Sequence, residues 1–133
     1  MVRMRGLHCS RAHFFAGSLC GRGGARRSAA GDAKCALNVT WFDTGDFLEQ
    51  HTGDPNGNIA FTWCLTKNWQ YNYGGNLHLL PAGSGIEQIE IPAFNRFLLF
   101  PVAGSRTPHF VSRVNANVAA RRLAVSGWYR QSA

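Results

Sequence analysis

The chain has 133 residues, 45% of them hydrophobic, which suits one domain with one ordinary core. No apolar run approaches the roughly 18 residues of a membrane helix, so we expect no membrane partner. The formal net charge of +7 is uneven: residues 1–36 hold seven basic groups and one acidic group, a net of +6, and residues 37–133 hold seven and six, a net of +1. Because the positive charge belongs to the N-terminal stretch, we do not expect the folded part to bind nucleic acid.

The N-terminal stretch, residues 1–36, is rich in Gly, Ala, Ser and Arg and lacks helical or strand periodicity. We predict that it is a disordered basic tail or follows from a misplaced start codon, and that residues 1 to about 35 make no stable contacts. A transit peptide and a zinc site are weaker alternatives, because no amphipathic face and no C-x-x-C pair are present. The apolar piece is too short for a signal peptide, so the compartment is open, with the cytoplasm favoured.

From residue 37 onward, short runs rich in β-branched and aromatic residues alternate with turn residues. They predict strands at 38–42, 46–52, 59–65, 76–80, 87–91, 96–101, 109–114 and 122–129. The run from Ile59 to Thr66 is nearly continuously apolar, which predicts a central strand covered on both faces, with Cys64 as a buried thiol. Eight short strands without a convincing helix indicate an all-β sandwich or small barrel.

Six motifs in this half follow one another in a recognisable order. They are H-T-G-D-P-N-G-N, L-T-K-N-W, Y-G-G-N-L-H-L-L, I-P-A-F-N-R-F-L-L-F, P-H-F-V and R-L-A-V-S-G-W-Y. Together, from about Asn38 to Arg130, they resemble the catalytic core of the iron(II) and 2-oxoglutarate-dependent oxygenases, in the prolyl-hydroxylase-like branch.

The resemblance implies that residues 37–133 form a double-stranded β-helix, a jelly roll with the metal at its open end. The family has helices and further strands ahead of this core, so the fold is expected to be incomplete at its N-terminus. An exposed sheet edge there would favour a homodimer. The resemblance also implies Fe²⁺ and 2-oxoglutarate as cofactors and a small-molecule or peptidyl substrate.

Residue by residue, the resemblance makes His51 the first iron ligand and His109 the second. Two neutral imidazoles and one carboxylate suit iron(II) and leave three coordination positions for 2-oxoglutarate and oxygen. His78 lies outside both motifs on a strand face, and we expect it to be structural.

Arg122 matches the family arginine six residues before Trp128, which implies that it binds the distal carboxylate of 2-oxoglutarate. A guanidinium holds a carboxylate through two parallel hydrogen bonds and stays charged when buried. Successive strand residues face opposite ways, so only one of Arg121 and Arg122 can face the site.

The third ligand departs from the family's H-x-D motif, because Gly53 occupies the usual carboxylate position and Asp54 follows one residue late. Asp54 could reach the metal through a bulge or where the strand has ended, and it could instead begin a D-P-N-G turn. Three hypotheses follow. The chain is a hydroxylase with Asp54 as ligand, a halogenase with chloride in the gap at Gly53, or a non-catalytic β-barrel module that has lost iron.

Overall fold

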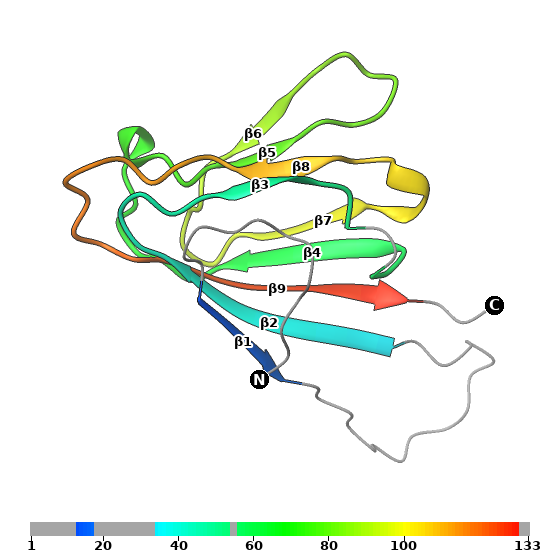
Figure 1. Ribbon diagram of the computed structural model, residues 1–133, viewed down its shortest axis with the longest axis horizontal. Helices are drawn as coiled ribbons and strands as arrows, with labels where there is room; N and C mark the ends of the chain where they lie inside the picture. Colours follow the sequence, from blue (N-terminus) through cyan, green and yellow to red (C-terminus); the bar gives the residue numbers. More distant parts are fainter. Residues whose placement is uncertain (1–12, 18–33, 54–55, 131–133) are drawn as a thin grey trace.

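The computed structural model describes residues 13–17, 34–53 and 56–130, with side chains from residue 37 onward. Two antiparallel sheets lie one above the other (Figure 1). In the described part the only helices are two 3₁₀ turns, η1 (Tyr71–Tyr73) and η2 (Ala103–Ser105), and neither is long or apolar enough to cross a membrane.

The larger sheet has five strands in the order β1-β2-β9-β4-β7. Their bounds are β1 His13–Gly17, β2 Lys34–Phe42, β9 Arg122–Arg130, β4 Ile59–Cys64 and β7 Phe97–Pro101. The smaller sheet has the order β3-β8-β5-β6. Its strands are β3 Leu48–His51, β8 His109–Val111, β5 Leu77–Leu79 and β6 Gln88–Glu90. Apart from β1–β2 and β5–β6, neighbouring strands in the sheets are not consecutive in the sequence, as in a jelly roll.

All eight predicted strands are present, and the all-β jelly roll is confirmed. Turn chemistry fixes their ends. Between β2 and β3, Gly45 adopts a φ of +87°, and the Asp46 carboxylate accepts a 2.9 Å hydrogen bond from the Asp43 amide. Only glycine adopts a left-handed backbone without steric strain, so the local sequence specifies this turn.

The hydrophobic core fills the space between the two sheets. Val102 and Val114 are fully buried there. The core also contains Phe42, Ala60, Trp69, Leu77, Leu79, Phe100, Val111 and Val118. Both sheets contribute side chains to this core, so its packing holds the sheets together. It also fixes the position of the other side chains in this interior.

Two predictions about the large sheet need correction. Residues 13–17 were expected to make no stable contacts, yet they form β1, which pairs with β2. H-F-F-A-G shows no alternation, so only the hydrogen-bonding edge of β2 specifies this strand. Residues 34–36 of the predicted tail belong to β2 and pair with β9. The rest of the predicted tail, residues 1–12 and 18–33, lies outside the described residues.

The second correction concerns β4. It lies inside the sheet between β9 and β7, as predicted, and Cys64 is a buried thiol. Its second face, however, is not covered by the described residues: Ile59 is 43% exposed and Trp63 is 40% exposed. The apolar run of β4 therefore gives the strand two apolar faces, and the described residues bury only one of them.

Candidate active site

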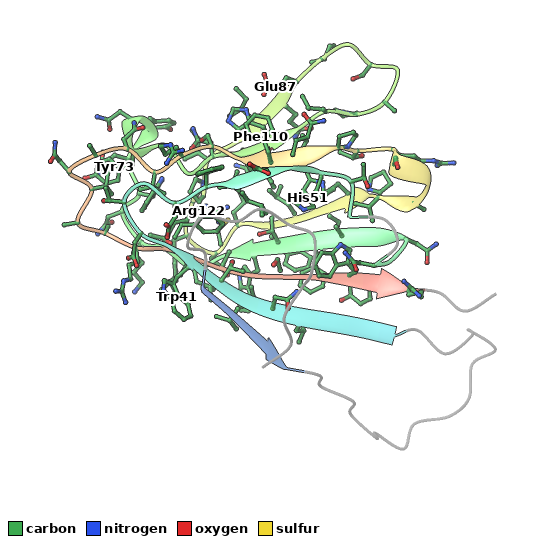
Figure 2. All side chains as sticks on the ribbon, viewed as in Figure 1. Trp41, His51, Tyr73, Glu87, Phe110 and Arg122 are labelled. Atoms are coloured by element: carbon green, nitrogen blue, oxygen red, sulfur yellow. The ribbon has the colours of Figure 1, made fainter. Side chains whose placement is uncertain are left out.

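A cavity of about 80 Å³ lies between the two sheets and is lined by residues of both. His51, His109 and Arg122 all line it, and Figure 2 shows His51 and Arg122 in the space between the layers. The volume accommodates several water-sized groups, which suits a small ligand.

The two histidines come from neighbouring strands of the small sheet. His51 ends β3 and His109 begins β8, and the two residues are directly paired in the sheet. Their ring centroids are 4.1 Å apart, with an angle of 59° between the ring planes. Residues that are 58 positions apart in the sequence therefore present their imidazoles to one point.

Each imidazole is oriented in the same way by a backbone carbonyl two residues earlier. The Nδ1 of His51 lies 2.9 Å from the Glu49 carbonyl oxygen, and that of His109 lies 2.9 Å from the Thr107 carbonyl oxygen. A carbonyl only accepts hydrogen bonds, so Nδ1 must carry the proton, and each neutral ring keeps an unprotonated Nε2. This is the tautomer that a metal-binding histidine needs.

Burial keeps both rings neutral. It lowers the pKa of His51, although the bond to the Glu49 carbonyl opposes the shift. Burial lowers the pKa of His109 to about 4, with a smaller contribution from the nearby His51. Near pH 7 the pair is uncharged and offers two lone pairs, which favours a cation between them.

Arg122 is 3% exposed and no carboxylate among the described residues pairs with it. Its guanidinium carbon lies 4.9 Å from the centroid of the Phe42 ring, and its Nε has no hydrogen-bond partner there. Burial lowers the pKa of the guanidinium. An unpaired buried cation is costly unless an anion neutralises it, so this end of the cavity is built for an anion. The neighbouring Arg121 is exposed and pairs with Asp43 instead, as strand alternation predicted.

The comparisons with known proteins bear on this arrangement directly. The family model of the 2OG-Fe(II) oxygenase superfamily matches residues 37–130. The chain belongs to the 2OG-Fe(II) oxygenase superfamily.

Solved structures share the fold of this chain. A prolyl-4-hydroxylase from Pseudomonas putida superposes with a TM-score of 0.64 at 22% identity, over 75% of this chain and 53% of that one. A prolyl hydroxylase from Trichoplax adhaerens, solved with a peptide fragment of hypoxia inducible factor, gives 0.65 at 25% identity, over 77% and 46%. The chain thus spans about half the length of these two proteins. No curated protein matches it.

In this member of the superfamily, position 53 lies beside the histidine pair but carries no side chain. A Cβ placed on Gly53 would lie 3.4 Å from Cε1 of His109, 3.1 Å from Nε1 of Trp128 and 3.2 Å from Cγ1 of Val102. The Gly53 φ of +75° is left-handed as well. The position expected for the carboxylate is therefore both crowded and unfavourable for any other residue.

Asp54, the predicted third ligand, lies outside the described residues. Its neighbours show where the turn closes: the amide of Asn56 donates to the carbonyl of Gly53 at 2.8 Å, one residue earlier than the predicted D-P-N-G turn. Within the described part of the chain, no group of three or more His, Cys, Asp or Glu side chains could hold a metal. The ligand roles of His51, His109 and Asp54 thus stay predictions.

Sequence reasoning missed four residues of the cavity wall. Asn38, Thr62 and Ser126 lie side by side on β2, β4 and β9 and line the cavity, and Trp128 follows Ser126 on the same face. The signal was present in part, because Ser126 and Trp128 are four and six residues after Arg122 and so share its side of the strand. The partners across the sheet depend on register, which alternation alone does not specify.

His78 has the structural position that was expected. Its Nδ1 lies 2.5 Å from Oε1 of Glu87, its ring stacks on Phe110 at 4.2 Å, and it does not line the cavity. It therefore serves as an internal control for the two cavity histidines.

Proposed function

We propose that the chain is an iron(II)- and 2-oxoglutarate-dependent dioxygenase that hydroxylates a peptidyl or small-molecule substrate. One observation carries the proposal: two neutral imidazoles with free Nε2 atoms and an unpaired buried arginine share one cavity. A structural histidine pair would not need matching tautomers, and a structural arginine would need a partner.

The residues fit the two cofactors that the superfamily uses. His51 and His109 would hold Fe²⁺ through Nε2, and Arg122 would pair with the distal carboxylate of 2-oxoglutarate. Bound iron supplies the oxygen chemistry that couples decarboxylation of 2-oxoglutarate to oxidation of a substrate C–H bond. The protein's share is to keep both imidazoles neutral, to orient them and to neutralise the dicarboxylate.

The cavity floor between the two ends is suited to a polar ligand. On the inward side of β9, Ser126 follows Arg122 by four residues and precedes Trp128 by two. Asn38 on β2 and Thr62 on β4 are the partners of Ser126 in the neighbouring strands. Inward-facing residues along a strand are about 6.6 Å apart, so the three lie between the arginine and the metal end. We propose that their amide and hydroxyl groups bind and orient the middle of 2-oxoglutarate.

Asp54 remains the proposed third ligand. Trp128 Nε1 is buried without an acceptor in the described part and lies 3.1 Å from the Cβ position of residue 53. A donor there would stabilise a carboxylate that completes the ligand set. Nothing among the described residues or in the superfamily match supports the chloride of the halogenase hypothesis, since the match names iron(II) and 2-oxoglutarate.

For the substrate, a peptide that contains proline is the first choice. The support is the likeness to two prolyl hydroxylases, one of which was solved with a peptide fragment. Small molecules remain the second choice.

The experiment is iron-dependent conversion of 2-oxoglutarate to succinate by the full chain. Without added substrate, these conditions report slow uncoupled turnover, and we expect Asp54→Ala to lower it at least about 100-fold, since one ligand and one negative charge are lost. Glu49→Ala is the matched control, because Glu49 is an exposed carboxylate two residues before His51 that touches it only through its backbone carbonyl.

Two results would contradict the proposal. Turnover that survives Asp54→Ala removes Asp54 from the ligand set. An inactive natural protein that also fails to bind iron establishes the non-catalytic module, the other hypothesis that the sequence left open.

A further inference from the structure

The aliphatic stem of Arg122 passes close to the backbone of Gly75, which belongs to the other layer of the fold. Arg122 begins β9 in the large sheet, whereas Gly75 lies just before β5 of the small sheet. A Cβ placed on Gly75 would lie 3.0 Å from Cδ of Arg122. Carbon atoms in contact are normally about 3.5–4.0 Å apart, so the stem can lie there only because position 75 has no side chain.

The backbone at Gly75 is fixed by contacts that do not involve Arg122. The amide of Gly75 donates to the carbonyl of Arg113 at 3.3 Å, and the indole Nε1 of Trp69 donates to the carbonyl of Gly74 at 2.9 Å. Gly75 and Trp69 are both buried. Hydrogen-bonded, buried backbone moves less readily than a side chain, so a side chain added at position 75 would displace Arg122.

The guanidinium end of Arg122 is restrained from the large sheet. Its guanidinium carbon lies 4.9 Å from the centroid of the ring of Phe42, the residue with which Arg122 is paired in the sheet. Arg122 is 3% exposed, so close packing limits the rotamers that it can adopt. Cδ is bonded directly to Nε of the guanidinium, so a displacement of Cδ at the Gly75 contact moves the whole planar fork.

We propose that Gly75 is a positioning residue for the anion end of the cavity. Its missing side chain lets Arg122 hold the guanidinium where the distal carboxylate of 2-oxoglutarate would bind, so this inference rests on the proposed function. Gly75 is not among the residues that line the cavity, and it acts through Arg122. Two parallel hydrogen bonds to a carboxylate need a defined direction as well as a distance, so a small displacement of the fork should weaken binding.

The test is the affinity of the full chain, loaded with Mn²⁺ in place of Fe²⁺, for 2-oxoglutarate by calorimetry. We expect Gly75→Ala to weaken 2-oxoglutarate binding at least about 10-fold and to leave the Mn²⁺ affinity unchanged, because the fork moves and the histidine pair does not. Gly85→Ala is the matched control and should bind as the natural protein does. Gly85 has a φ of +63°, against +65° for Gly75, and its Cβ would meet nothing within 4 Å.

A second background separates positioning from a merely structural role. In Arg122→Ala the stem is absent, so adding Gly75→Ala should change the 2-oxoglutarate affinity by less than about 2-fold. Urea unfolding without ligand tests the contact itself. The loss of unfolding midpoint caused by Gly75→Ala should fall by about half or more in the Arg122→Ala background. The remaining loss comes from Val114 and Trp69, whose atoms lie 3.2 and 3.3 Å from the same Cβ position.

Three results would overturn the proposal: unchanged 2-oxoglutarate affinity in folded Gly75→Ala, an equal loss in Gly85→Ala, or equal losses of midpoint in both backgrounds. If Gly75→Ala does not fold, the double variant decides. A folded double variant supports the contact with Arg122, and an unfolded one assigns the crowding to other neighbours and overturns it. A natural protein that binds Mn²⁺ but not 2-oxoglutarate refutes the proposed function instead, and the midpoints, which need no ligand, still decide whether Gly75 positions Arg122.

Discussion

The two faces of the large sheet reverse the usual relation between polarity and burial. The enclosed face carries Arg122, Thr62, Asn38 and Ser126, whereas the exposed face carries only uncharged, mostly large apolar side chains. Phe42, Ala60 and Phe100 of the enclosed face stabilise the fold as part of the core. The buried unpaired guanidinium of Arg122 and the exposed apolar side chains do not stabilise it by themselves. The enclosed face therefore fits the small anion that we propose, and the other face exposes apolar side chains that the described residues do not cover.

The largest effect should come from the histidine pair of the small sheet, which lines the same cavity as the inner face of the large sheet. We expect His109→Ala to weaken binding of Mn²⁺, an oxygen-stable substitute for Fe²⁺, at least about 100-fold, because half of the imidazole ligands are lost. Calorimetric titration measures the affinity. His78→Ala should bind as the natural protein does, and equal losses in both variants would remove the site.

Acid should weaken the metal-free protein through the same histidine. In the unfolded chain His109 is protonated with its usual pKa of 6.5, whereas in the folded protein its pKa is about 4. Stability is therefore lost as the pH falls from about 6.5 to about 4, by about 3 kcal/mol at 1.36 kcal/mol per pH unit. Urea unfolding of the natural protein and His109→Asn across this range isolates the contribution, and identical pH slopes would refute it.

Position 53 should resist any side chain. We expect Gly53→Ala to lower the free energy of unfolding by about 2–3 kcal/mol, from left-handed backbone strain and from contacts at 3.1–3.4 Å. Gly45→Ala is the matched control, because Gly45 is also left-handed but its Cβ would meet nothing within 4 Å, so it should cost only about 1–2 kcal/mol. Equal costs would show that the space beside Gly53 is open.

Arg122 should lower the stability of the metal-free protein. Arg122→Met removes a buried charge without a described acidic partner, so we expect the free energy of unfolding to rise by roughly 1–3 kcal/mol. Denaturant unfolding measures it. A structural arginine would give the opposite sign.

The smallest effect should come from the neighbouring arginine. Arg121 is exposed, and its ion pair with Asp43 joins two exposed or half-buried side chains. We expect Arg121→Met to change stability by less than about 0.5 kcal/mol. A larger change would mean that the two arginines were assigned to the wrong faces.

Sequence patterns predicted the strands well because alternation and turn residues are local signals. Gly45 and Asp46 specify their turn through their own backbone and side chains, and alternation correctly separated Arg121 from Arg122. His51 and His109 were distinguished from His78 by their motifs, since all three lie on strands and periodicity treats them alike.

The remaining features depend on partners that are distant in sequence. β1 exists because it pairs with the edge of β2, and the row of Asn38, Ser126 and Thr62 depends on the register of three strands. The crowding at Gly53 comes from Trp128, Val102 and His109, which local patterns do not bring together. For the same reason, the apolar run of β4 could not reveal which of its faces would lack a cover.

The most direct test of the central claim, that the polar inner face is built for a dicarboxylate beside a metal, is 2-oxoglutarate affinity by calorimetry. Mn²⁺-loaded natural protein, Arg122→Met and Arg121→Met would be compared. We predict that Arg122→Met weakens 2-oxoglutarate binding at least about 100-fold while Arg121→Met leaves it unchanged, because only Arg122 faces the cavity. Unchanged affinity in a folded Arg122→Met protein would contradict the account.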